Sequence, residues 1–304
     1  MTTPGADLSS SRPQAAGIRN AMTVDVEDYF QVEAFAARIP RACWEGIPRR
    51  IEVNVDRLLE LFAAAGVGAT FFTLGWIAER HPQMVRRIAA AGHEVASHGY
   101  DHRRADRLDP PGFRRDVRRA KDILEQIVAR PVLGYRAPTF SLGLRSLWAY
   151  QILEEEGYRY SSSLYPIRHD LYGDVAAPRA PFRPTGGGLW EMPLTTRRLC
   201  GQNLPCAGGG YFRLLPYRLS RWNLAAVNAV EARPCIFYLH PWEIDAAQPR
   251  LAGIGMRARL RHYTNLTAMP ARLGRLVRDF RWGRMDEVFA DHLRAPAAPS
   301  AASG

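Results

Sequence analysis

The sequence predicts an α/β fold made of parallel βαβ units, and three observations carry this prediction. Short apolar runs with the length of strands alternate with longer segments whose apolar residues have helical spacing. Hydrophobic residues make up 47% and charged residues 23% of the chain, which excludes a disordered chain, a coiled coil and a collagen-like fibre. A length of 304 residues without an internal repeat is enough for one large domain with a buried core.

The alternation gives the expected elements in chain order. The expected strands are residues 21–26, 69–74, 93–97, 132–135, 188–192 and 235–239. The expected helices are residues 53–65, a helix that opens at residue 75, and residues 82–91, 110–129, 146–156 and 219–231. Gly66, Gly92 and Gly157 each follow one of these helices as a stop signal. Residues 178–188 and 207–210, which are rich in Gly or Pro, are expected to be surface loops that shape a cleft.

One uncharged stretch, residues 61–78, approaches the length of a membrane span. Its first part continues the helix that ends before Gly66, and a short β-rich run and the start of another helix follow. We therefore predict no transmembrane segment.

The two ends of the chain are predicted to be disordered tails, residues 1–20 and 291–304. The first has no apolar core of a signal peptide, so we expect a cytoplasmic protein. The folded domain is expected to span residues 21–290, with residues 245–290 as a C-terminal extension. Four scattered cysteines without a CxxC pair exclude a disulfide framework.

The net charge of +11 is carried almost entirely by arginine, since Lys121 is the only lysine. Arginines are densest in residues 250–284, which contain a single acid and several aromatic residues. A nucleic-acid or anionic-surface binding protein is the rival class that this composition offers. The helical spacing of Leu273, Leu276 and Val277 instead favours a helix packed on the core with a solvated basic face. We predict no nucleic-acid partner, and a peripheral contact with a membrane surface stays open.

The first candidate site is the acid cluster Asp25, Glu27 and Asp28, at the end of the first expected strand. Three neighbouring carboxylates repel one another unless a cation lies among them, and a metal is the usual cation. Strand alternation puts Asp25 and Glu27 on the same side. Asp28 lies past the strand, where it is a candidate for capping the next turn.

Three further candidates also follow expected strands, where α/β folds place their chemistry. His98 and His102 lie four residues apart, which puts them on one face of a helical turn as candidate metal ligands. Arg136 is placed to hold a carboxylate ionised and oriented. His240 follows the most apolar strand and precedes a proline, so it is a candidate general acid or base.

Together and in this order, the acid cluster, His-x-x-x-His, Arg-x-Pro and Leu-His resemble the polysaccharide deacetylases of the NodB-homology type, carbohydrate esterase family 4. The flanking sequences VDVEDYFQVEAF, PCAGGGYFRLLPY and FYLHPWEID are similar to the subgroup encoded near exosortase and PEP-CTERM exopolysaccharide loci. The resemblance covers about residues 20–289. It implies a distorted (β/α) barrel with about seven strands that carries one divalent metal, usually Zn²⁺.

The resemblance also assigns roles to residues of this chain. Asp25 matches the catalytic base, His98 and His102 match two metal ligands, Arg136 matches the arginine that orients the base, and His240 matches the general acid. Relatives with an Asp-x-Asp arrangement favour Glu27 as the third metal ligand, with Asp28 as its rival. Pro138, Thr139 and Trp242 match substrate-binding positions, with a backbone N–H near Thr139 facing the oxyanion.

One departure from the family pattern concerns His240. Relatives often carry an aspartate that supports this histidine, but Ser161 stands at the corresponding position. A serine cannot replace the charge, so the partner of His240 is expected elsewhere or is absent.

The implied reaction is removal of N-acetyl groups from the amino sugars of an acetylated polysaccharide or a lipid-linked oligosaccharide. An amide is a poor electrophile and an amine is a poor leaving group, so both the carbonyl and the nitrogen need assistance. Aromatic residues near the strand ends are candidates for stacking on sugar rings, namely Tyr29, Phe30, Phe140, Tyr211 and Trp242. The alternative within the same fold is a hydrolase of another non-peptide C–N bond.

Overall fold

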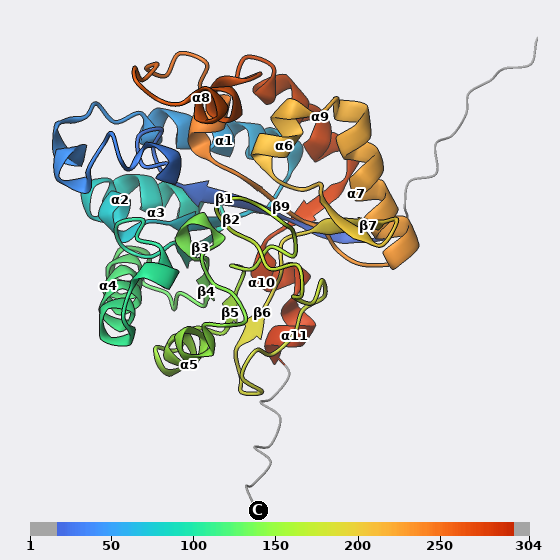
Figure 1. The fold of residues 1–304 in the computed structure, drawn as a ribbon, viewed down its shortest axis with the longest axis horizontal. Coiled ribbons are helices and arrows are strands. Elements are labelled where there is room, and N and C mark those ends of the chain that lie inside the picture. Colours follow the sequence, from blue (N-terminus) through green and yellow to red (C-terminus); the bar gives the residue numbers. More distant parts are fainter. Residues whose placement is uncertain (1–16, 295–304) are drawn as a thin grey trace, which may run out of the picture.

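A computed structural model describes residues 17–294 as one α/β unit (Figure 1). Its strands are β1 (Arg19–Val26), β2 (Thr70–Thr73), β3 (Glu94–Ser97), β4 (Gly134–Tyr135), β5 (Tyr160–Ser161), β6 (Trp190–Glu191), β7 (Thr196–Leu199), β8 (Gln202–Pro205), β9 (Ile236–Leu239) and β10 (Arg281–Gly283). Its helices are α1 (Ile51–Ala65), α2 (Gly75–Arg80), α3 (Pro82–Ala90), α4 (Pro110–Val128), α5 (Leu147–Glu155), α6 (Gly209–Leu214), α7 (Tyr217–Glu231), α8 (Met256–Tyr263), α9 (Met269–Asp279), α10 (Met285–Val288) and α11 (Ala290–Arg294).

The central sheet has 8 strands in the order β10-β1-β2-β3-β4-β5-β6, and β9 also pairs with β1. Every pairing in this sheet is parallel, and β7 and β8 form a separate antiparallel hairpin. Among residues 17–294 no ladder joins β6 to β9, so the sheet curls into a half-barrel. Thr195 and Gly208 bridge part of this gap, because Ile236 N donates to Thr195 Oγ1 and Gly208 pairs with Tyr238. The predicted distorted (β/α) barrel is confirmed.

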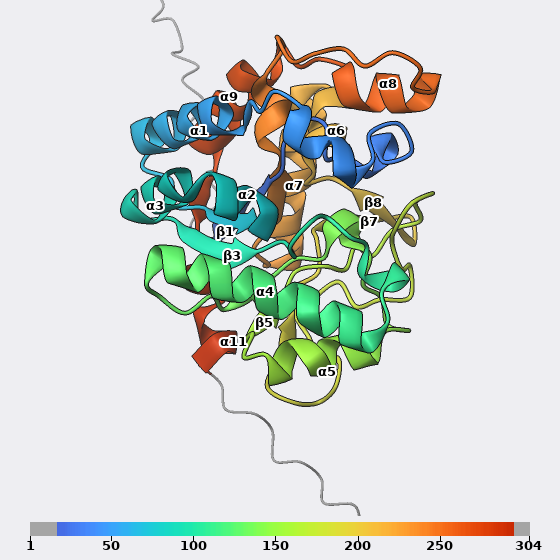
Figure 2. The ribbon, with the colours of Figure 1, turned by 90° about the vertical axis from the view of Figure 1, so that its left-hand side faces the viewer.

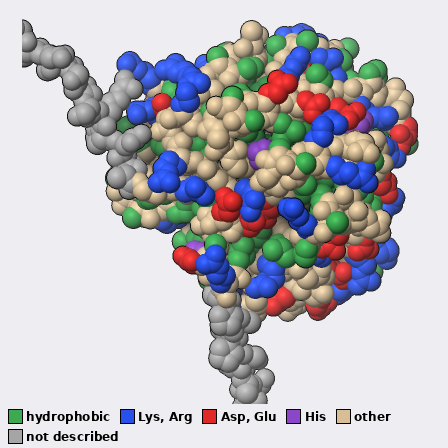
Figure 3. Space-filling view, turned by 180° about the vertical axis from the view of Figure 1, so that it is seen from behind, with side chains coloured by type: hydrophobic (Ala, Val, Ile, Leu, Met, Phe, Trp, Pro, Cys, Tyr) green, Lys and Arg blue, Asp and Glu red, His purple; other side chains and the backbone are tan. Residues whose placement is uncertain are grey.

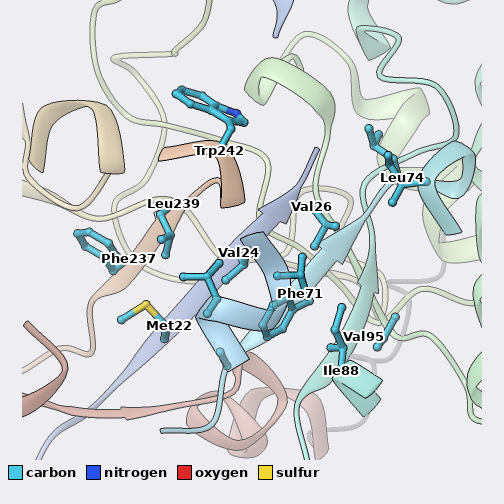
Figure 4. Packing of buried hydrophobic residues seen from close by; sticks show 14 of the residues in the cluster. Met22, Val24, Val26, Phe71, Leu74, Ile88, Val95, Phe237, Leu239 and Trp242 are labelled. Carbon is cyan, nitrogen blue, oxygen red and sulfur yellow. The ribbon is translucent and has the colours of Figure 1, made fainter. Parts of the chain in front are cut away.

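The alternation of side chains along β1 separates the core from the site. Met22, Val24 and Val26 pack into the main hydrophobic cluster, which Figure 4 shows with Phe71 of β2 and Leu239 of β9. Ala21, Thr23 and Asp25 alternate with these residues and face the interior of the half-barrel. Their carboxylate and hydroxyl groups therefore lie where the strand ends converge.

Helices cover the outside of the sheet. Figures 1 and 2 show α1 to α5 following it from β1 towards β5, with α7 and α9 beside β9 and α8 at the rim near α6. The uncharged residues 61–78 divide into the end of α1, β2 and the start of α2, as expected. Among residues 17–294, no helix is both long enough and apolar enough to cross a membrane.

Two expectations about local structure are wrong, and one element is additional. Residues 98–102 form an irregular loop and not a helical turn, because Gly99 and His102 take left-handed φ values of 73° and 58°. Residues 207–210 are not a surface loop, since Gly209 opens α6 and lies buried beneath the site. The β7–β8 hairpin was not expected at all.

The arginine-rich C-terminal stretch is a packed part of the domain. Leu273, Leu276 and Val277 of α9 are buried, as their spacing predicts. On the opposite side of the molecule from Figure 1, Lys and Arg side chains are scattered among acidic ones (Figure 3).

The expected domain limits differ from the structure by a few residues at each end. β1 begins at Arg19, and α11 extends to Arg294. The rest of the two expected tails, residues 1–16 and 295–304, lies outside the described residues.

Candidate active site

The ends of β1, β3, β4 and β9 bring most of the predicted residues to one cavity of about 630 Å³. These four strands run parallel, so their carboxyl ends meet at the same side of the half-barrel. The predicted residues that line the cavity are Asp25, Glu27, His98, His102, Thr139, His240 and Trp242. Arg136 and Pro138 are buried behind this wall.

Asp25 and Arg136 form a fully buried ion pair. Arg136 Nη1 donates to Asp25 Oδ1 at 2.6 Å and to Thr23 Oγ1 at 2.8 Å. Its Nε and Nη2 donate to the backbone oxygen and the hydroxyl of Ser162, and its guanidinium lies 4.0 Å from the centre of the Phe72 ring. Arg136 is therefore held on every side, and Asp25 Oδ2 is left facing the cavity and His240, whose Nε2 is 4.0 Å away.

Glu27, His98 and His102 form a group able to hold a metal ion, with their ligand atoms within 4.8 Å of one another. His98 Nδ1 lies 2.8 Å from the backbone oxygen of Arg136, which leaves Nε2 for the cavity. Burial lowers the pKa of His98 to about 4, so the imidazole is neutral, as a ligand must be.

The chemistry of Glu27, His98 and His102 also suits a bound cation. Glu27 Oε2 is buried, and the one group close to it among the described residues is His102 Nε2, at 2.7 Å. Burial raises the pKa of Glu27, but the neighbouring imidazoles outweigh it and hold the pKa well below its usual range. Two imidazoles and one carboxylate with an open side are the ligand set of a catalytic zinc site.

Asp28, the rival third ligand, points away from the histidines. Its Oδ2 accepts hydrogen bonds from the backbone N–H of Arg50 and Ile51 at the start of α1, and its Oδ1 accepts one from Tyr29 N. Asp28 thus accepts from the first backbone N–H groups of a helix that begins at Ile51, whereas its position past the strand predicted a cap on the turn next to Asp28.

His240 and Trp242 line the cavity beside Glu27. His240 Nε2 lies 3.3 Å from Glu27 Oε1, and its ring stacks on Trp242 at 5.1 Å. Trp242 Nε1 donates to Glu27 Oε1 at 3.4 Å. Burial lowers the pKa of His240, but Glu27 and Glu243 outweigh burial and raise the pKa to about 9.

The sequence did not identify Glu243 as a site residue, yet it is the partner of His240. His240 Nδ1 lies 2.8 Å from Glu243 Oε1, and Glu243 is fully buried. Arg213 of α6 donates from Nε to Glu243 Oε2 at 2.7 Å. One signal was available, because Glu243 lies three residues after His240, which is the spacing of the acid in a capping box.

The segments after β4 and the C-terminal half shape the rest of the cavity. Thr139 has a φ of 57°, and its Oγ1 is buried without a hydrogen-bond partner among the described residues. Of the aromatic residues proposed to stack on sugar, Phe140, Tyr211 and Trp242 line the cavity. Tyr29 and Phe30 do not, because they are buried in the main hydrophobic cluster.

Two family models match the chain, one in each half. Residues 43–161 match polysaccharide deacetylase, and residues 162–290 match a domain of unknown function, DUF3473. His98, His102 and Arg136 lie in the first match. Arg213 and His240 lie in the second, so both halves contribute to the cavity.

Curated relatives match over short segments. A peptidoglycan deacetylase of Helicobacter pylori is 28% identical over 113 residues, which are 37% of this chain and 38% of that protein. A chitooligosaccharide deacetylase of Rhizobium leguminosarum is 35% identical over 68 residues, which are 22% of this chain and 32% of that protein. The chain therefore spans less than two fifths of the length of these relatives.

One similar solved structure covers almost the whole chain. It is a protein of Mycobacterium smegmatis assigned as a polysaccharide deacetylase, with a TM-score of 0.58 and 23% sequence identity. The alignment covers 97% of each chain. The two proteins share a fold.

Proposed function

We propose that the protein is a metal-dependent hydrolase that removes N-acetyl groups from amino sugars, as the match of residues 43–161 to the polysaccharide deacetylase family model suggests. The observation that carries this proposal is the meeting of three groups in one cavity. They are the Asp25–Arg136 pair, the metal-ligand set of Glu27, His98 and His102, and His240.

Asp25 is the proposed general base. Its Oδ1 is fixed by Arg136, and its Oδ2 faces the cavity, where it can accept a proton from the attacking water. The Arg136 guanidinium compensates the buried charge of this carboxylate and fixes its orientation. Asp25 Oδ2 is thus held in the direction from which the proton of the attacking water would come.

Glu27, His98 and His102 are the proposed metal ligands, and their types favour zinc. A bound divalent metal would polarise the acetyl carbonyl and lower the pKa of a bound water. Thr139 lines the cavity, and its backbone N–H is the proposed hydrogen-bond donor to the oxyanion.

His240 is the proposed general acid. Its Nδ1 is turned towards Glu243, and its Nε2 is turned towards the cavity. Nε2 therefore delivers the proton that the sugar nitrogen needs to leave as an amine. Without that proton the intermediate would expel water and return to the amide.

We propose an exopolysaccharide or its lipid-linked precursor as the substrate, as the similarity to the exosortase-associated subgroup suggests. Arg257 and Arg261 of α8 line the cavity, which suits a substrate that carries anionic groups. Contact of α8 with a membrane surface stays a prediction. The cytoplasmic location stays a prediction as well.

The proposal is tested with the metal-loaded protein and a panel of N-acetylated polymers: chitooligosaccharides, peptidoglycan and exopolysaccharide with its lipid-linked precursor. We expect a free amine to form on at least one of them, and no product with the Asp25→Asn variant. If the metal-loaded protein left all of them unchanged and bound RNA with a steep salt dependence, the rival binding function would replace this proposal.

A further inference from the structure

A buried row of charged side chains runs from His240 through Glu243 to Arg213, all within the C-terminal half of the chain. His240 Nδ1 meets Glu243 Oε1 at 2.8 Å, and Glu243 Oε2 accepts a hydrogen bond from Arg213 Nε at 2.7 Å. The side chains of Glu243 and Arg213 are both 1% exposed. Ser161, at the position where relatives often carry a supporting aspartate, donates to Ser163 Oγ instead.

Arg213 is immobilised by backbone oxygens of one short segment. Its Nη1 donates to the oxygens of His262 and Thr264 at 3.1 and 2.7 Å, and its Nη2 donates to the oxygen of Arg261 at 2.8 Å. Since Nε pairs with Glu243, every nitrogen of the guanidinium is engaged. The residues around the end of α8 thus fix the cation that faces Glu243.

Helix α6 supplies both the cation and the space for Glu243. A Cβ atom at Gly209 would lie 2.3 Å from Glu243 Oε1, so no side chain fits there while Glu243 keeps its position. Gly209 and Arg213 lie four residues apart on this one helix. The sequence GGGYFR, residues 208–213, therefore builds the niche of Glu243.

We propose that Glu243 is the positioning residue of the general acid His240 and that Arg213 holds Glu243 in place. This inference rests on the proposed function. It assigns a role to the C-terminal half, residues 162–290, which supplies the acid, its carboxylate partner and the cation behind them.

The chemistry follows from the two ring nitrogens of His240. Nδ1–H donates to the Glu243 carboxylate, which stabilises the imidazolium and directs Nε2–H into the cavity. When the C–N bond of the substrate breaks, the Nε2 proton moves to the departing nitrogen. The neutral imidazole that remains keeps its proton on Nδ1, against Glu243.

The test compares Glu243→Gln with Asp245→Asn as the matched control. Asp245 lies two residues further on, is equally buried, pairs with Arg50 and makes no recorded contact with His240. On a chitooligosaccharide, we expect Glu243→Gln to lower kcat by about 10- to 100-fold with KM changed by less than about 2-fold. A kcat for Glu243→Gln equal to that of wild type, or an equal loss in Asp245→Asn, would overturn the inference.

A spectroscopic reading separates this inference from the proposed function. The Nδ1 proton of His240, assigned by its absence in His240→Ala, should give a downfield imidazole NMR signal in wild type and in Asp245→Asn. The signal should be lost or shifted upfield in Glu243→Gln, and its retention there would contradict the pairing. If wild type deacetylated no substrate but showed the signal, and Glu243→Gln lost it, the proposed function would be refuted and the pairing would stand.

Arg213 is tested by a double-mutant cycle. Because it acts through Glu243, Arg213→Met should lower kcat in wild type but add less than about 3-fold to the loss in Glu243→Gln. Arg50→Met is the matched control and should leave kcat within about 2-fold of wild type. If Arg213→Met does not fold, Gly209→Ala takes its place, since its methyl group must displace the Glu243 carboxylate. Unchanged kcat in Gly209→Ala, or additive losses in the cycle, would exclude the role of α6.

Discussion

Replacing Arg136 with methionine removes the guanidinium that faces Asp25 and leaves a buried carboxylate without its cation. Asp25 is 1% exposed and Arg136 is 0% exposed, so water cannot take over this role. Breaking one partner of a buried ion pair costs about 3–5 kcal/mol of folding free energy. At about 2–4 °C per kcal/mol for a chain of this size, Tm should fall by about 10 °C.

The activity should fall as well. The variant loses the hydrogen bond that fixes Asp25 Oδ1, so Oδ2 loses the orientation in which it can accept a proton from water. General-base catalysis contributes about 10²- to 10⁴-fold, so kcat of Arg136→Met should drop by at least about 10²-fold.

The assay is urea denaturation of the metal-free protein, combined with a double-mutant cycle. In the Asp25→Asn background the carboxylate charge is gone, so Arg136→Met should cost about 2 kcal/mol less than in wild type. Arg87→Met, which breaks an exposed pair with Asp56, is the control and should cost less than about 1 kcal/mol. A stability within about 1 kcal/mol of wild type for Arg136→Met, or an equal cost in both backgrounds, would refute the reasoning.

Three further predictions follow from the site and the core. Glu27→Gln should lose a bound divalent ion in elemental analysis, whereas Asp28→Asn should retain it, and the reverse result would restore Asp28 as the ligand. Phe71→Ala should lower the free energy of unfolding by about 3–5 kcal/mol, because Phe71 is fully buried. Val230→Ala, at an exposed position, should change it by less than about 0.5 kcal/mol. Equal effects of the two variants in urea denaturation would contradict the packing of Phe71. Burial raises the pKa of Glu94 from 4.5 to about 7, so its contribution to stability is complete below about pH 4.5 and is lost as the pH rises through about 7. Glu94→Gln lacks this titration, so wild type should lose about 1–3 kcal/mol relative to the variant between about pH 4.5 and 8, and a pH-independent difference would rule out the raised pKa.

The sequence predicted the elements whose apolar residues recur with a clear helical or strand spacing. Helix α4, expected at residues 110–129, spans Pro110–Val128, because its apolar residues recur at helical spacing and Asp109 caps its first turn. Strand β5 has only two residues, too few to show an alternation. The β7–β8 hairpin pairs TRRL with QNLP, which carry no apolar alternation, so composition gave no sign of it.

The sequence predicted the site residues that directly follow strands. It did not predict those whose role depends on a contact in the tertiary structure. Strand ends alone pointed to Asp25, Glu27 and the two histidines. The helical reading of His98 and His102 was wrong because left-handed backbone lets a loop bring them together. The pairing of Glu243 with Arg213 joins residues 30 positions apart and depends on backbone oxygens near residue 262, which no local pattern encodes.

The central claim is that the cavity formed by Asp25, the Glu27–His98–His102 set and His240 deacetylates amino sugars. The most direct measurement is the amount of acetate released from an N-acetylhexosamine oligomer by the metal-loaded protein, with the free amine counted alongside it. Acetate and amine should appear in equal amounts, vanish in Asp25→Asn and fall in His240→Ala. Release that persists unchanged in Asp25→Asn, or no release by wild type from any N-acetylated polymer or lipid-linked precursor, would contradict the account.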